Sequence, residues 1–547
     1  MLDALDTAAV RKARGAFFTP DDITAFISAW AIRSPQDRIL EPSSGDAAFL
    51  VAAVRRLRSI GGVSPVVDGV EIHPQSAAVG RERVVEAGGT AQIHESDFFL
   101  VPATSAYDAV IGNPPYIRYQ GFTGEARARS RRAALRAGVA LTGLASSWAA
   151  FTVHSALFLK DGGRLGLVLP AELLSVNYAA PVRQFLFDHF RRVELVVFDE
   201  QVFPEAEADV VLLLAEGYGL GPTDHAVVRQ AKNAADLRSL DAGLSWTPTD
   251  PSGKWTGSLV DSNAGEPLRT LLQGGEFTNL QTWGETTLGI VTGNNNYFTL
   301  SPERVRELGL HRSELLRLSP PGSSHLRGLT LSDDMLTRLG RKGRSTYLFY
   351  PRVEPSDEAR AYIAAGHQAG VDSAYKCRVR KVWYRVPVVP PADLLLTCMN
   401  ADTPRLTTNE ARAHHLNSVH GVYLADQHRA LGRELLPLAS LNSITLLNAE
   451  MVGRAYGGGI LKLEPREADG WAVPAPGLVA RSADELRAVK DRVARALRVG
   501  RLLDAVGIVD RILFEDSGEV STDEIEQVRH ARAELVRRRT VRAASGR

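Results

Sequence analysis

A proline corner follows a short apolar run in the first quarter of the chain. The run Asp108-Ala109-Val110-Ile111-Gly112 has the composition of a buried strand, and it stops at Asn113-Pro114-Pro115-Tyr116. Proline fixes φ, lacks an N–H group and holds the preceding residue extended, so the corner is stiff and its carbonyl oxygens have no local donors. We therefore expect a rigid turn that presents hydrogen-bond acceptors.

Such a corner suits the binding of an exocyclic amino group. The amino nitrogen of adenine or cytosine is a poor nucleophile because its lone pair is delocalised into the ring. If the Asn113 side-chain oxygen and the Pro114 carbonyl accept its two hydrogens, the nitrogen becomes tetrahedral and its lone pair faces an incoming methyl group. Pro115 stiffens the corner, and Tyr116 would stack on the base. The alternative is an ordinary turn that ends a strand.

Two strands upstream of the corner end in residues that suit a nucleoside ligand. Strand 38–41 is followed by the small-residue turn 42–46 and a helix expected at 47–58, a pattern that lets the backbone approach a ligand closely. Strand 66–71 ends in Glu71, whose carboxylate could accept hydrogen bonds from ribose hydroxyls. The alternative for Glu71 is a capping or solvated acid.

A third strand and the N-terminal segment add two further candidates. Strand 91–94 leads to Ser96-Asp97-Phe98-Phe99, where the acid could accept from an adenine amino group while an aromatic ring packs on the base; the alternative is a cap followed by core phenylalanines. Near the N-terminus, Thr19 as N-cap and Pro20 at the first helical position predict a helix start.

The elements that must position these residues alternate between strand and helix. After the corner, the pattern predicts helices and strands at 148–159, 164–169, 181–190, 193–198 and 209–214. Only the ten residues 199–208 separate the last two strands, too few for the helical crossover that parallel strands need. We expect an α/β fold with a seven-stranded, mostly parallel Rossmann-like sheet, an antiparallel last strand, and ligands at the carboxyl ends of the strands.

Length and composition divide the chain into domains. A chain of 547 residues exceeds one core, and its net charge of +1 requires any nucleic-acid surface to be local. We expect a first domain over 1–235, a mixed α+β domain over 236–480 and a helical segment over 481–547. Ser482 with Glu485 and Ser521 with Glu524 match helix capping boxes in that last segment. With two cysteines, no signal peptide and no apolar span, a cytoplasmic protein without a metal site is expected.

Basic residues gather in two places. The stretch between Tyr116 and Trp148 carries six arginines, and segment 375–385 interleaves five basic residues with aromatics. Both could contact phosphates and bases of nucleic acid; the alternatives are a solvated helix face and a charged strand edge. From the second segment, we select as candidate DNA contacts Arg378, Arg380, Lys381 and Arg385.

The motif series as a whole resembles that of the gamma-class DNA amino-methyltransferases of the TaqI type. The similarity rests, in this order and spacing, on Phe17-Phe18-Thr19-Pro20, Leu40-Glu41-Pro42-Ser43-Ser44-Gly45-Asp46, Val70-Glu71, Ser96-Asp97-Phe98-Phe99 and Asn113-Pro114-Pro115-Tyr116. Residues 289–298 and 453–463 resemble the start and end of the family's recognition domain. The resemblance implies an S-adenosylmethionine-dependent enzyme with a C-terminal target-recognition domain that binds double-stranded DNA.

The resemblance also implies the roles of single residues. The cofactor would contact Thr19, Glu41, Ser44, Gly45, Glu71, Asp97 and Phe98. The first four would hold its methionine end, Glu71 its ribose, and Asp97 with Phe98 its adenine. Phe203 falls where the family keeps an aromatic residue against the flipped base. One departure is Ala47, where the family often has a second glycine.

We therefore expect a DNA adenine N6-methyltransferase of a restriction-modification or related defence system. Cytosine N4 stays open, because the same corner can hold either amine. The base would be flipped from the duplex and methylated by in-line transfer, without metal or covalent nucleophile. Competing functions are a methyltransferase acting on RNA or protein glutamine, a fused methyltransferase-nuclease and an inactive recognition subunit. The resemblance implies that the N-terminal segment with Phe17-Phe18-Thr19-Pro20 is a lid over the cofactor, and because the chain begins almost at this lid, no N-terminal nuclease is expected. A separate cognate restriction endonuclease stays open as a partner.

Overall fold

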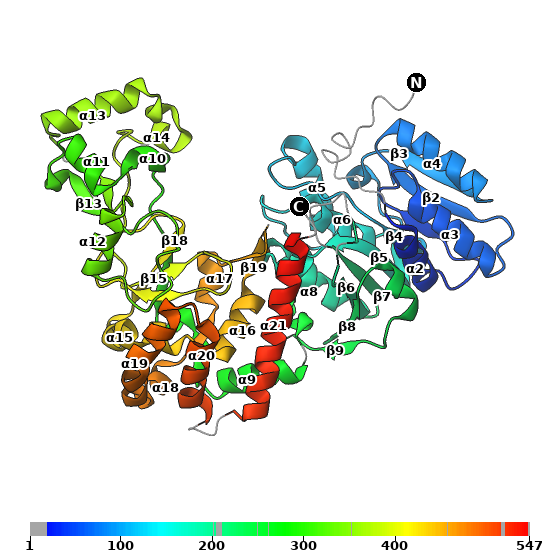
Figure 1. Ribbon diagram of the computed structural model, residues 1–547. Coiled ribbons are helices and arrows are strands. Elements are labelled where there is room, and N and C mark those ends of the chain that lie inside the picture. The colour runs from blue at the N-terminus through cyan, green and yellow to red at the C-terminus, as the bar shows by residue number, and fades with distance from the viewer. Residues whose placement is uncertain are drawn as a thin grey trace. The chain divides into compact units, whose positions relative to one another are not determined.

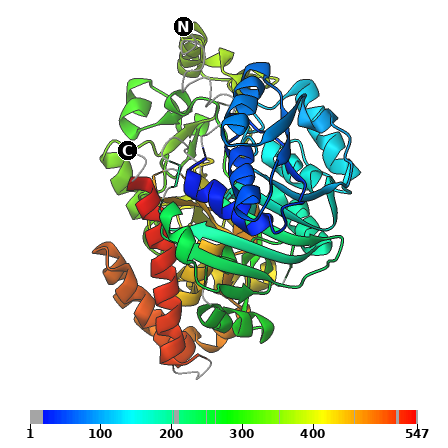
Figure 2. The same ribbon diagram turned by 90° about the vertical axis from the view of Figure 1, so that its right-hand side faces the viewer.

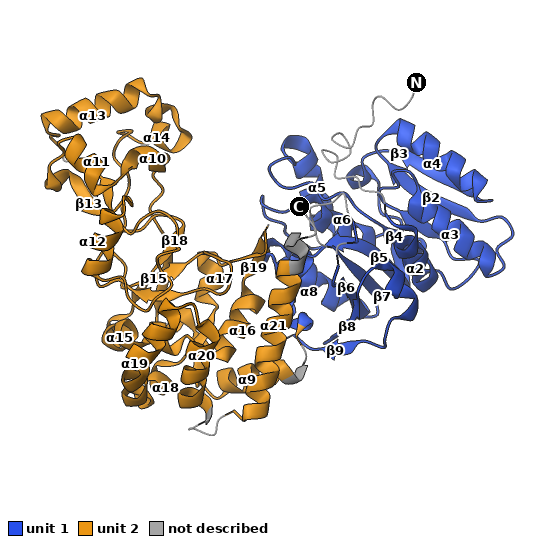
Figure 3. Ribbon diagram, viewed as in Figure 1, with its two compact units in different colours: residues 1–259, 541–547 blue, residues 260–540 orange. Residues whose placement is uncertain are grey.

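The computed structural model describes residues 19–200, 202–203, 210–248, 250–260, 262–351, 353–456, 458–515 and 520–544. Motif residues Phe17 and Phe18, and the residues on both sides of 202–203, lie outside these ranges. The chain divides into two compact units, residues 1–259 with 541–547 and residues 260–540 (Figure 3).

A mixed nine-stranded sheet forms the centre of the first unit, in the order β3-β2-β1-β4-β5-β7-β6-β8-β9 (Figure 1). The strands are β1 (Ile39–Glu41), β2 (Val66–Glu71), β3 (Thr90–Glu95), β4 (Tyr107–Gly112), β5 (Leu159–Pro170), β6 (Phe190–Phe198), β7 (Val210–Tyr218), β8 (Ala226–Ala231) and β9 (Leu244–Trp246). The consecutive apolar residues of β4, β5 and β7 are buried, as expected for strands covered on both faces.

The expected antiparallel seventh strand is confirmed, because β7 pairs antiparallel with both β5 and β6. The expected strand number is wrong. β8 pairs parallel with β6, and β9 pairs antiparallel with β8, so the sheet has nine strands and not seven. The first strand after the predicted helix 148–159 also begins earlier than expected, because β5 already starts at Leu159.

Helices cover both faces of this sheet. They are α2 (Asp21–Ala31), α3 (Ala48–Ser59), α4 (Pro74–Glu86), α5 (Gly124–Arg136), α6 (Ser147–Ala156), α7 (Glu172–Ser175) and α8 (Ala180–His189). Helices α2 and α3 lie side by side against one face (Figures 1 and 2), and α5, α6 and α8 pack on the other. Helix α2 is capped by Pro20 and not by Thr19, so its expected start is wrong by one residue.

The first unit extends beyond the expected boundary at residue 235. Strand β9 belongs to its sheet, and Trp255 is completely buried in its core. The backbone N–H of Trp255 donates to the Leu174 carbonyl at 2.8 Å, and the buried Arg183 donates to the Ser252 carbonyl. These contacts hold residues 236–259 in the first unit, which ends at Leu259.

The second unit is built from several small antiparallel sheets and many helices. Its strands are β10 (Phe277–Asn279), β11 (Gly284–Leu288), β12 (Thr299–Leu300), β13 (Leu315–Arg317), β14 (Tyr347–Phe349), β15 (Leu394–Thr397), β16 (Met399–Asn400), β17 (Leu406–Thr408), β18 (Val419–Leu424), β19 (Arg454–Tyr456), β20 (Ile460–Lys462) and β21 (Ala472–Pro474). Its helices are α9 (Ser262–Gln273), α10 (Asn295–Phe298), α11 (Pro302–Glu307), α12 (Asp333–Arg341), α13 (Asp357–Gln368), α14 (Tyr375–Arg378), α15 (Arg429–Ala439), α16 (Ser443–Val452), α17 (Pro465–Asp469), α18 (Pro476–Arg481), α19 (Ala483–Arg498), α20 (Leu502–Asp510) and α21 (Thr522–Ala544).

The C-terminal helices are part of this second unit and not a separate segment beginning at residue 481. Asp510 is buried and accepts hydrogen bonds from Ser443 of α16 and Arg529 of α21. The capping box at Ser521 and Glu524 is confirmed by reciprocal hydrogen bonds, whereas Ser482 makes no side-chain cap bond to α19.

A search of the described residues for membrane spans finds no single helix that is long and apolar enough. One bent pair, 426–439 with 443–452, passes on length and composition. The apolar side chains Leu435, Leu436, Ile444 and Leu447 of this pair are buried in the second unit.

Candidate active site

The proline corner and the small-residue turn lie together at the carboxyl edge of the sheet. Strands β1 and β4 are parallel neighbours, with Leu40 opposite Val110. A Cβ atom on Gly112 would lie 3.4 Å from Pro42 Cδ and 3.6 Å from Glu41 Cγ. The corner that begins at Asn113 therefore starts beside the turn that follows β1.

Hydrogen bonds fix the side chain of Asn113. Its Nδ2 donates to Thr19 Oγ1 at 3.2 Å, and its Oδ1 accepts from the Tyr116 hydroxyl at 2.6 Å. The Tyr116 hydroxyl also lies 3.0 Å from the Val168 carbonyl of β5. An amide oxygen has two lone pairs, so Asn113 Oδ1 keeps one acceptor site beyond the Tyr116 bond.

The two proline carbonyls of the corner differ. Ser147 Oγ donates to the Pro115 carbonyl and accepts from the backbone N–H of Ile117. Among the described residues, the Pro114 carbonyl has no donor in the protein. Ser147 begins α6 and braces the corner, a role that no pattern in the sequence indicates. The corner thus presents the acceptor at Pro114 that the sequence predicts.

Tyr116 does more than the expected stacking. Its ring is half-buried and packs against the cores on both faces of the sheet, and burial raises the pKa of its hydroxyl well above the usual range. A neutral hydroxyl donates to Asn113 and orients the amide. Contact between the Tyr116 ring and a base stays a prediction.

Glu71 and Gly45 form a cradle next to the corner. Glu71 is 6 % exposed; its Oε2 accepts the Gly45 N–H and its Oε1 accepts the His73 N–H, both at 2.8 Å. Gly45 adopts a φ of +49°, and no atom lies within 4 Å of the place where a Cβ would stand. Each Glu71 oxygen retains a further lone pair for a ligand hydroxyl. The sequence predicted both residues at this site.

The turn 42–46, which contains Gly45, also has polar atoms without partners among the described residues. Ser43 Oγ and Ser44 Oγ are buried and have no hydrogen-bond partner in the described part of the chain. Buried polar groups are normally satisfied, so these hydroxyls indicate a polar ligand. Glu41, 3 % exposed, accepts the Leu50 N–H, and burial raises the pKa of its carboxyl. The donor set fits the amino acid and ribose parts of S-adenosylmethionine.

The backbone conformation of Ala47 is one that favours glycine, the residue that the TaqI-type family often has at this position. Ala47 adopts a φ of +64° at the N-cap of α3, a left-handed conformation that costs L-residues about 1–2 kcal/mol. Its methyl group is completely buried in the core that includes α3 and α4. The burial of this methyl group therefore offsets part of the conformational free-energy cost of the left-handed backbone.

Two expected aromatic contacts are instead core residues. Phe98 is 3 % exposed and stacks with Phe151 and Phe158 at centroid distances of 5.4 and 5.1 Å. Phe203 is 4 % exposed and packs in the core on the α2–α4 face. Phe98 therefore follows the alternative of a cap and core phenylalanines, since Asp97 Oδ1 accepts the Phe99 N–H at 3.0 Å.

The acid at Asp97 is partly engaged by the arginine-rich stretch. Arg129 of α5 lies 3.4 Å from Asp97 Oδ2. Arg127 and Arg131 donate to backbone carbonyls nearby, and Arg132 pairs with Glu125. Four of the six arginines thus bond within the protein, which leaves Arg118 and Arg136 exposed.

The four candidate DNA contacts of the second unit separate into two kinds. Arg380 donates to the Val291 and Thr292 carbonyls at 2.8 and 2.7 Å, so its guanidinium is engaged within the protein, and contact between Arg380 and DNA stays a prediction. Arg378 and Lys381 are exposed and Arg385 is half-buried, and no side-chain bond involves these three among the described residues. Helix α14 and a turn replace the strand edge considered from the sequence.

Comparison with protein families finds two matches along the chain. Residues 74–203 match the family described as Eco57I restriction-modification methylase. Residues 252–514 match the family described as type II methyltransferase M.Eco57I, C-terminal domain. The two matches fall mainly in the first and second units, respectively.

Individual relatives show the same similarity over most of their length. Type II methyltransferase M.AccI of Acinetobacter calcoaceticus is 23 % identical over 467 residues, which cover 84 % of each chain. Type II methyltransferase M.XamI of Xanthomonas campestris pv. amaranthicola is 25 % identical over 489 residues, 84 % of this chain and 85 % of the relative. Among solved structures, the type IIL restriction-modification enzyme MmeI in complex with DNA has a similar fold, with a TM-score of 0.56, 11 % identity, and coverage of 94 % of this chain and 75 % of that chain.

Proposed function

Since the chain belongs to the Eco57I family of type II restriction-modification DNA methyltransferases, we propose that it methylates adenine N6 of a base flipped from double-stranded DNA. The methyl donor is S-adenosylmethionine. The observation that carries this proposal is the Asn113-Pro114 corner beside the Gly45 and Glu71 cradle. The corner presents an amide oxygen and a carbonyl that has no donor among the residues the structure describes.

The corner acts on the amino group of the base. Asn113 Oδ1 and the Pro114 carbonyl each accept a hydrogen bond from one N–H of this amino group. The stiff proline backbone holds both acceptors in place before the base arrives. Thr19 and Tyr116 orient the Asn113 amide. The nitrogen lone pair is thereby directed away from the ring, and positive charge that develops on nitrogen is stabilised by the two oxygens. The proton leaves afterwards to water or through Asn113.

The cradle holds the methyl donor. Bound S-adenosylmethionine supplies an electrophilic methyl group. Glu71 would accept hydrogen bonds from the ribose hydroxyls of the cofactor. Glu41, Ser44 and Gly45, together with Thr19, would hold its methionine end. Asp97 accepts from its adenine amino group after releasing Arg129. Phe98 supports this end of the site from the core.

Adenine is preferred over cytosine on the likeness of the Asn-Pro-Pro-Tyr corner to the adenine enzymes of the family. The second unit recognises the target sequence in DNA, with Arg378, Lys381 and Arg385 as contacts. The protein acts in the cytoplasm, where a separate cognate restriction endonuclease would cleave unmodified DNA.

Transfer of a labelled methyl group to duplex DNA tests the proposal. Purified protein is incubated with methyl-labelled S-adenosylmethionine and unmethylated plasmid, and the DNA is digested to nucleosides and separated. Label in N6-methyl-2′-deoxyadenosine is the expected result. Label confined to RNA or to a protein glutamine substrate offered in parallel would contradict it, and cleavage of the plasmid with magnesium present would identify a fused nuclease.

A further inference from the structure

A cluster of arginines lies in the second unit, outside the segment 375–385 that contains the residues proposed to contact DNA. Arg327 precedes α12, and Arg405 precedes β17. Arg532 and Arg539 are seven residues apart on α21, so they lie on the same side of that helix. We call these four residues the arginine cluster.

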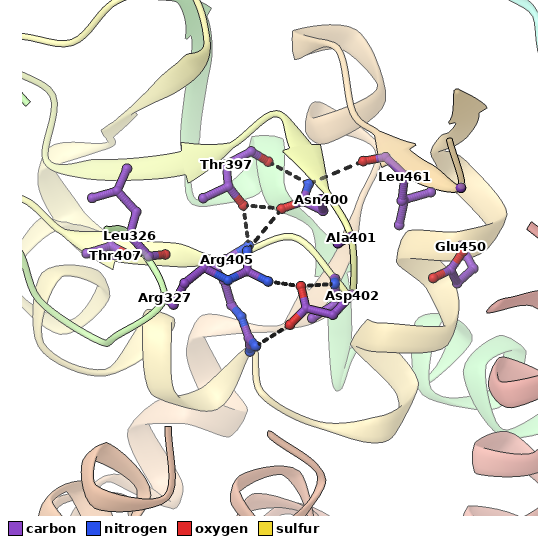
Figure 4. A network of polar contacts seen from close by, with 12 residues as sticks. Leu326, Arg327, Thr397, Asn400, Ala401, Asp402, Arg405, Thr407, Glu450 and Leu461 are labelled. Carbon is purple, nitrogen blue, oxygen red and sulfur yellow. Dashed lines mark hydrogen bonds and ion pairs between the residues drawn. The ribbon is translucent and has the colours of Figure 1, made fainter. Parts of the chain in front are cut away.

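Among the residues that the structure describes, two carboxylates form ion pairs with the arginine cluster. Figure 4 shows the Asp402 carboxylate between the guanidinium groups of Arg327 and Arg405, and it pairs with both. Glu450 forms a two-pronged pair with Arg539, with oxygen-to-nitrogen distances of 3.0 and 3.1 Å. Four cations and two anions leave a surplus of two positive charges.

Several donors of the arginine cluster have no acceptor within the described ranges. Arg405 is 5 % exposed, yet its Nε and Nη1 have no hydrogen-bond partner there. Arg532 Nε is likewise without a partner, and its Nη2 reaches only the Asp402 backbone carbonyl at 3.5 Å. Burial and neighbouring cations lower the pKa of Arg327 and Arg405 to about 10. Uncompensated buried charge is costly, so an anion that binds here would be strongly favoured.

The cluster is open to solvent on one side. The side chains of Arg327 and Asp402 are 32 % and 39 % exposed, whereas those of Arg405 and Arg539 are 5 % and 3 % exposed. The exposed edge thus carries a guanidinium group with a layer of fixed positive charge behind it. Guanidinium groups match the geometry of phosphate oxygens, and a low-dielectric surrounding strengthens the attraction.

We propose that Arg327 and Arg532 bind a backbone phosphate of the DNA substrate, with Arg405 and Arg539 supplying positive charge from beneath. This inference rests on the proposed DNA methylation and assigns one contact of that substrate. Asp402 competes with the phosphate for the Arg327 guanidinium group at the edge. Its carboxylate therefore limits the affinity of the site.

The salt dependence of DNA binding tests this phosphate site. We expect Arg327→Gln to lower the slope of log affinity against log salt by about 0.9, the value for one phosphate contact. Arg327→Lys, which keeps the charge, should retain the slope. Arg487→Gln is the matched control, because it removes an exposed arginine that pairs with Glu434 outside the cluster, and it should leave the slope unchanged.

Asp402→Asn gives a result of opposite sign. Loss of the competing carboxylate should tighten DNA binding roughly fivefold at low salt, with the increase vanishing at high salt. A purely structural cluster predicts weaker or unaltered binding, because Asp402 would only be a brace between Arg327 and Arg405. Circular dichroism and thermal melting establish that each variant is folded.

The outcomes separate this site from the proposed function. If wild-type protein binds and methylates duplex DNA while folded Arg327→Gln keeps the full slope, the phosphate site is overturned and the function stands. If inorganic phosphate raises the melting temperature of the wild type but not of Arg327→Gln, and the slope is again unaltered, the site binds a free anion and the assignment to DNA is overturned. If the wild type neither binds nor methylates duplex DNA, the proposed function itself fails.

Discussion

At the scale of the residue, the corner and the cradle divide the work of one reaction. Asn113 and Pro114 address the substrate amine, whereas Gly45 and Glu71 address the methyl donor. The two sets are close, because a Cβ on Gly112 would contact Pro42, but no hydrogen bond among the described residues joins Asn113 to Glu71. Substitutions in one set should therefore leave the function of the other largely intact.

Asn113→Ala should reduce methyl transfer by roughly 10²-fold or more, because one of the two acceptors for the amine is removed. Binding of S-adenosylmethionine, measured by calorimetry, should change little. Asn113→Asp keeps an oxygen at the same place and serves as the comparison. Collapse of cofactor affinity in Asn113→Ala would show that the division between corner and cradle is wrong.

Glu71→Ala should weaken cofactor binding by roughly 10- to 100-fold, the equivalent of one or two hydrogen bonds to a charged group. Because Glu71 also accepts the Gly45 and His73 N–H groups, Glu71→Gln is needed beside it to keep an acceptor for the turn. Equal cofactor affinity in the wild type and both variants, by the same calorimetry, would remove Glu71 from the ribose site.

At the scale of the element, the apolar runs and their turn residues made most of the first unit predictable. Strands β1 to β7, the antiparallel β7 and the position of the corner all follow from local patterns. Strands β8 and β9 did not, because Ala226–Ala231 and Leu244–Trp246 are short and become strands only through pairing with β6 and with each other. Local pattern carries no information on such pairing.

The residues of the candidate site also divide into those that local sequence patterns predict and those whose environment depends on distant parts of the chain. Gly45, Glu71 and Asn113 were predictable because chemistry and turn geometry require these residue types at strand ends. The burial of Phe98 and Phe203 and the internal bonds of Arg380 were not, because they depend on partners distant in sequence. Arg380 and its acceptor Val291, for example, are 89 residues apart.

In the basic segment around α14, substitutions of exposed residues and of the internally bonded Arg380 should have different effects. Arg378→Gln with Lys381→Gln should lower the salt slope of DNA binding, by about 0.9 for each phosphate that is no longer bound, with little change in stability. Arg380→Gln should instead reduce the stability of the second unit by about 2 kcal/mol, because two partly buried carbonyls are deprived of a charged donor. Salt titrations of binding and urea denaturation measure the two effects. An unaltered slope in the double variant would place α14 away from DNA.

Helix α21 should be a structural part of the second unit and not a loose basic tail. The pair between Glu450 and Arg539 joins α16 to α21, and both side chains are 3 % exposed. Glu450→Ala leaves a buried guanidinium without its partner, which costs about 3–5 kcal/mol, measurable by urea denaturation. Glu434→Ala, which removes an exposed pair with Arg487, is the control and should have little effect. Equal stability of the two variants would show that α21 is not anchored by this pair.

At the scale of the whole molecule, buried histidines make both units sensitive to acid. Burial lowers the pKa of His154 in the first unit, and of His325 and His415 in the second, from 6.5 to about 4. A group whose pKa is depressed on folding contributes stability that is complete above pH 6.5 and is lost as the pH falls toward 4. The loss for each histidine is about 3 kcal/mol.

In thermal melting between pH 7.5 and pH 4.5, the melting temperature should therefore be constant down to about pH 6.5 and fall at lower pH. His415→Gln should reduce the pH dependence, because His415 is completely buried and neither ring nitrogen has a hydrogen-bond partner in the described part of the chain. A melting temperature that is constant over this range would mean that these histidines are not buried in the neutral form.

Mapping of modified bases in a host genome tests the central claim most directly. The full chain and its Asn113→Ala variant are expressed separately in cells that lack methyltransferases of their own, and the genomic DNA is sequenced for modified bases. We predict N6-methyladenine at one recurrent sequence in cells with the wild type and none above background in cells with the variant. Modification of cytosine N4 at that sequence, or an identical pattern from both proteins, would contradict it.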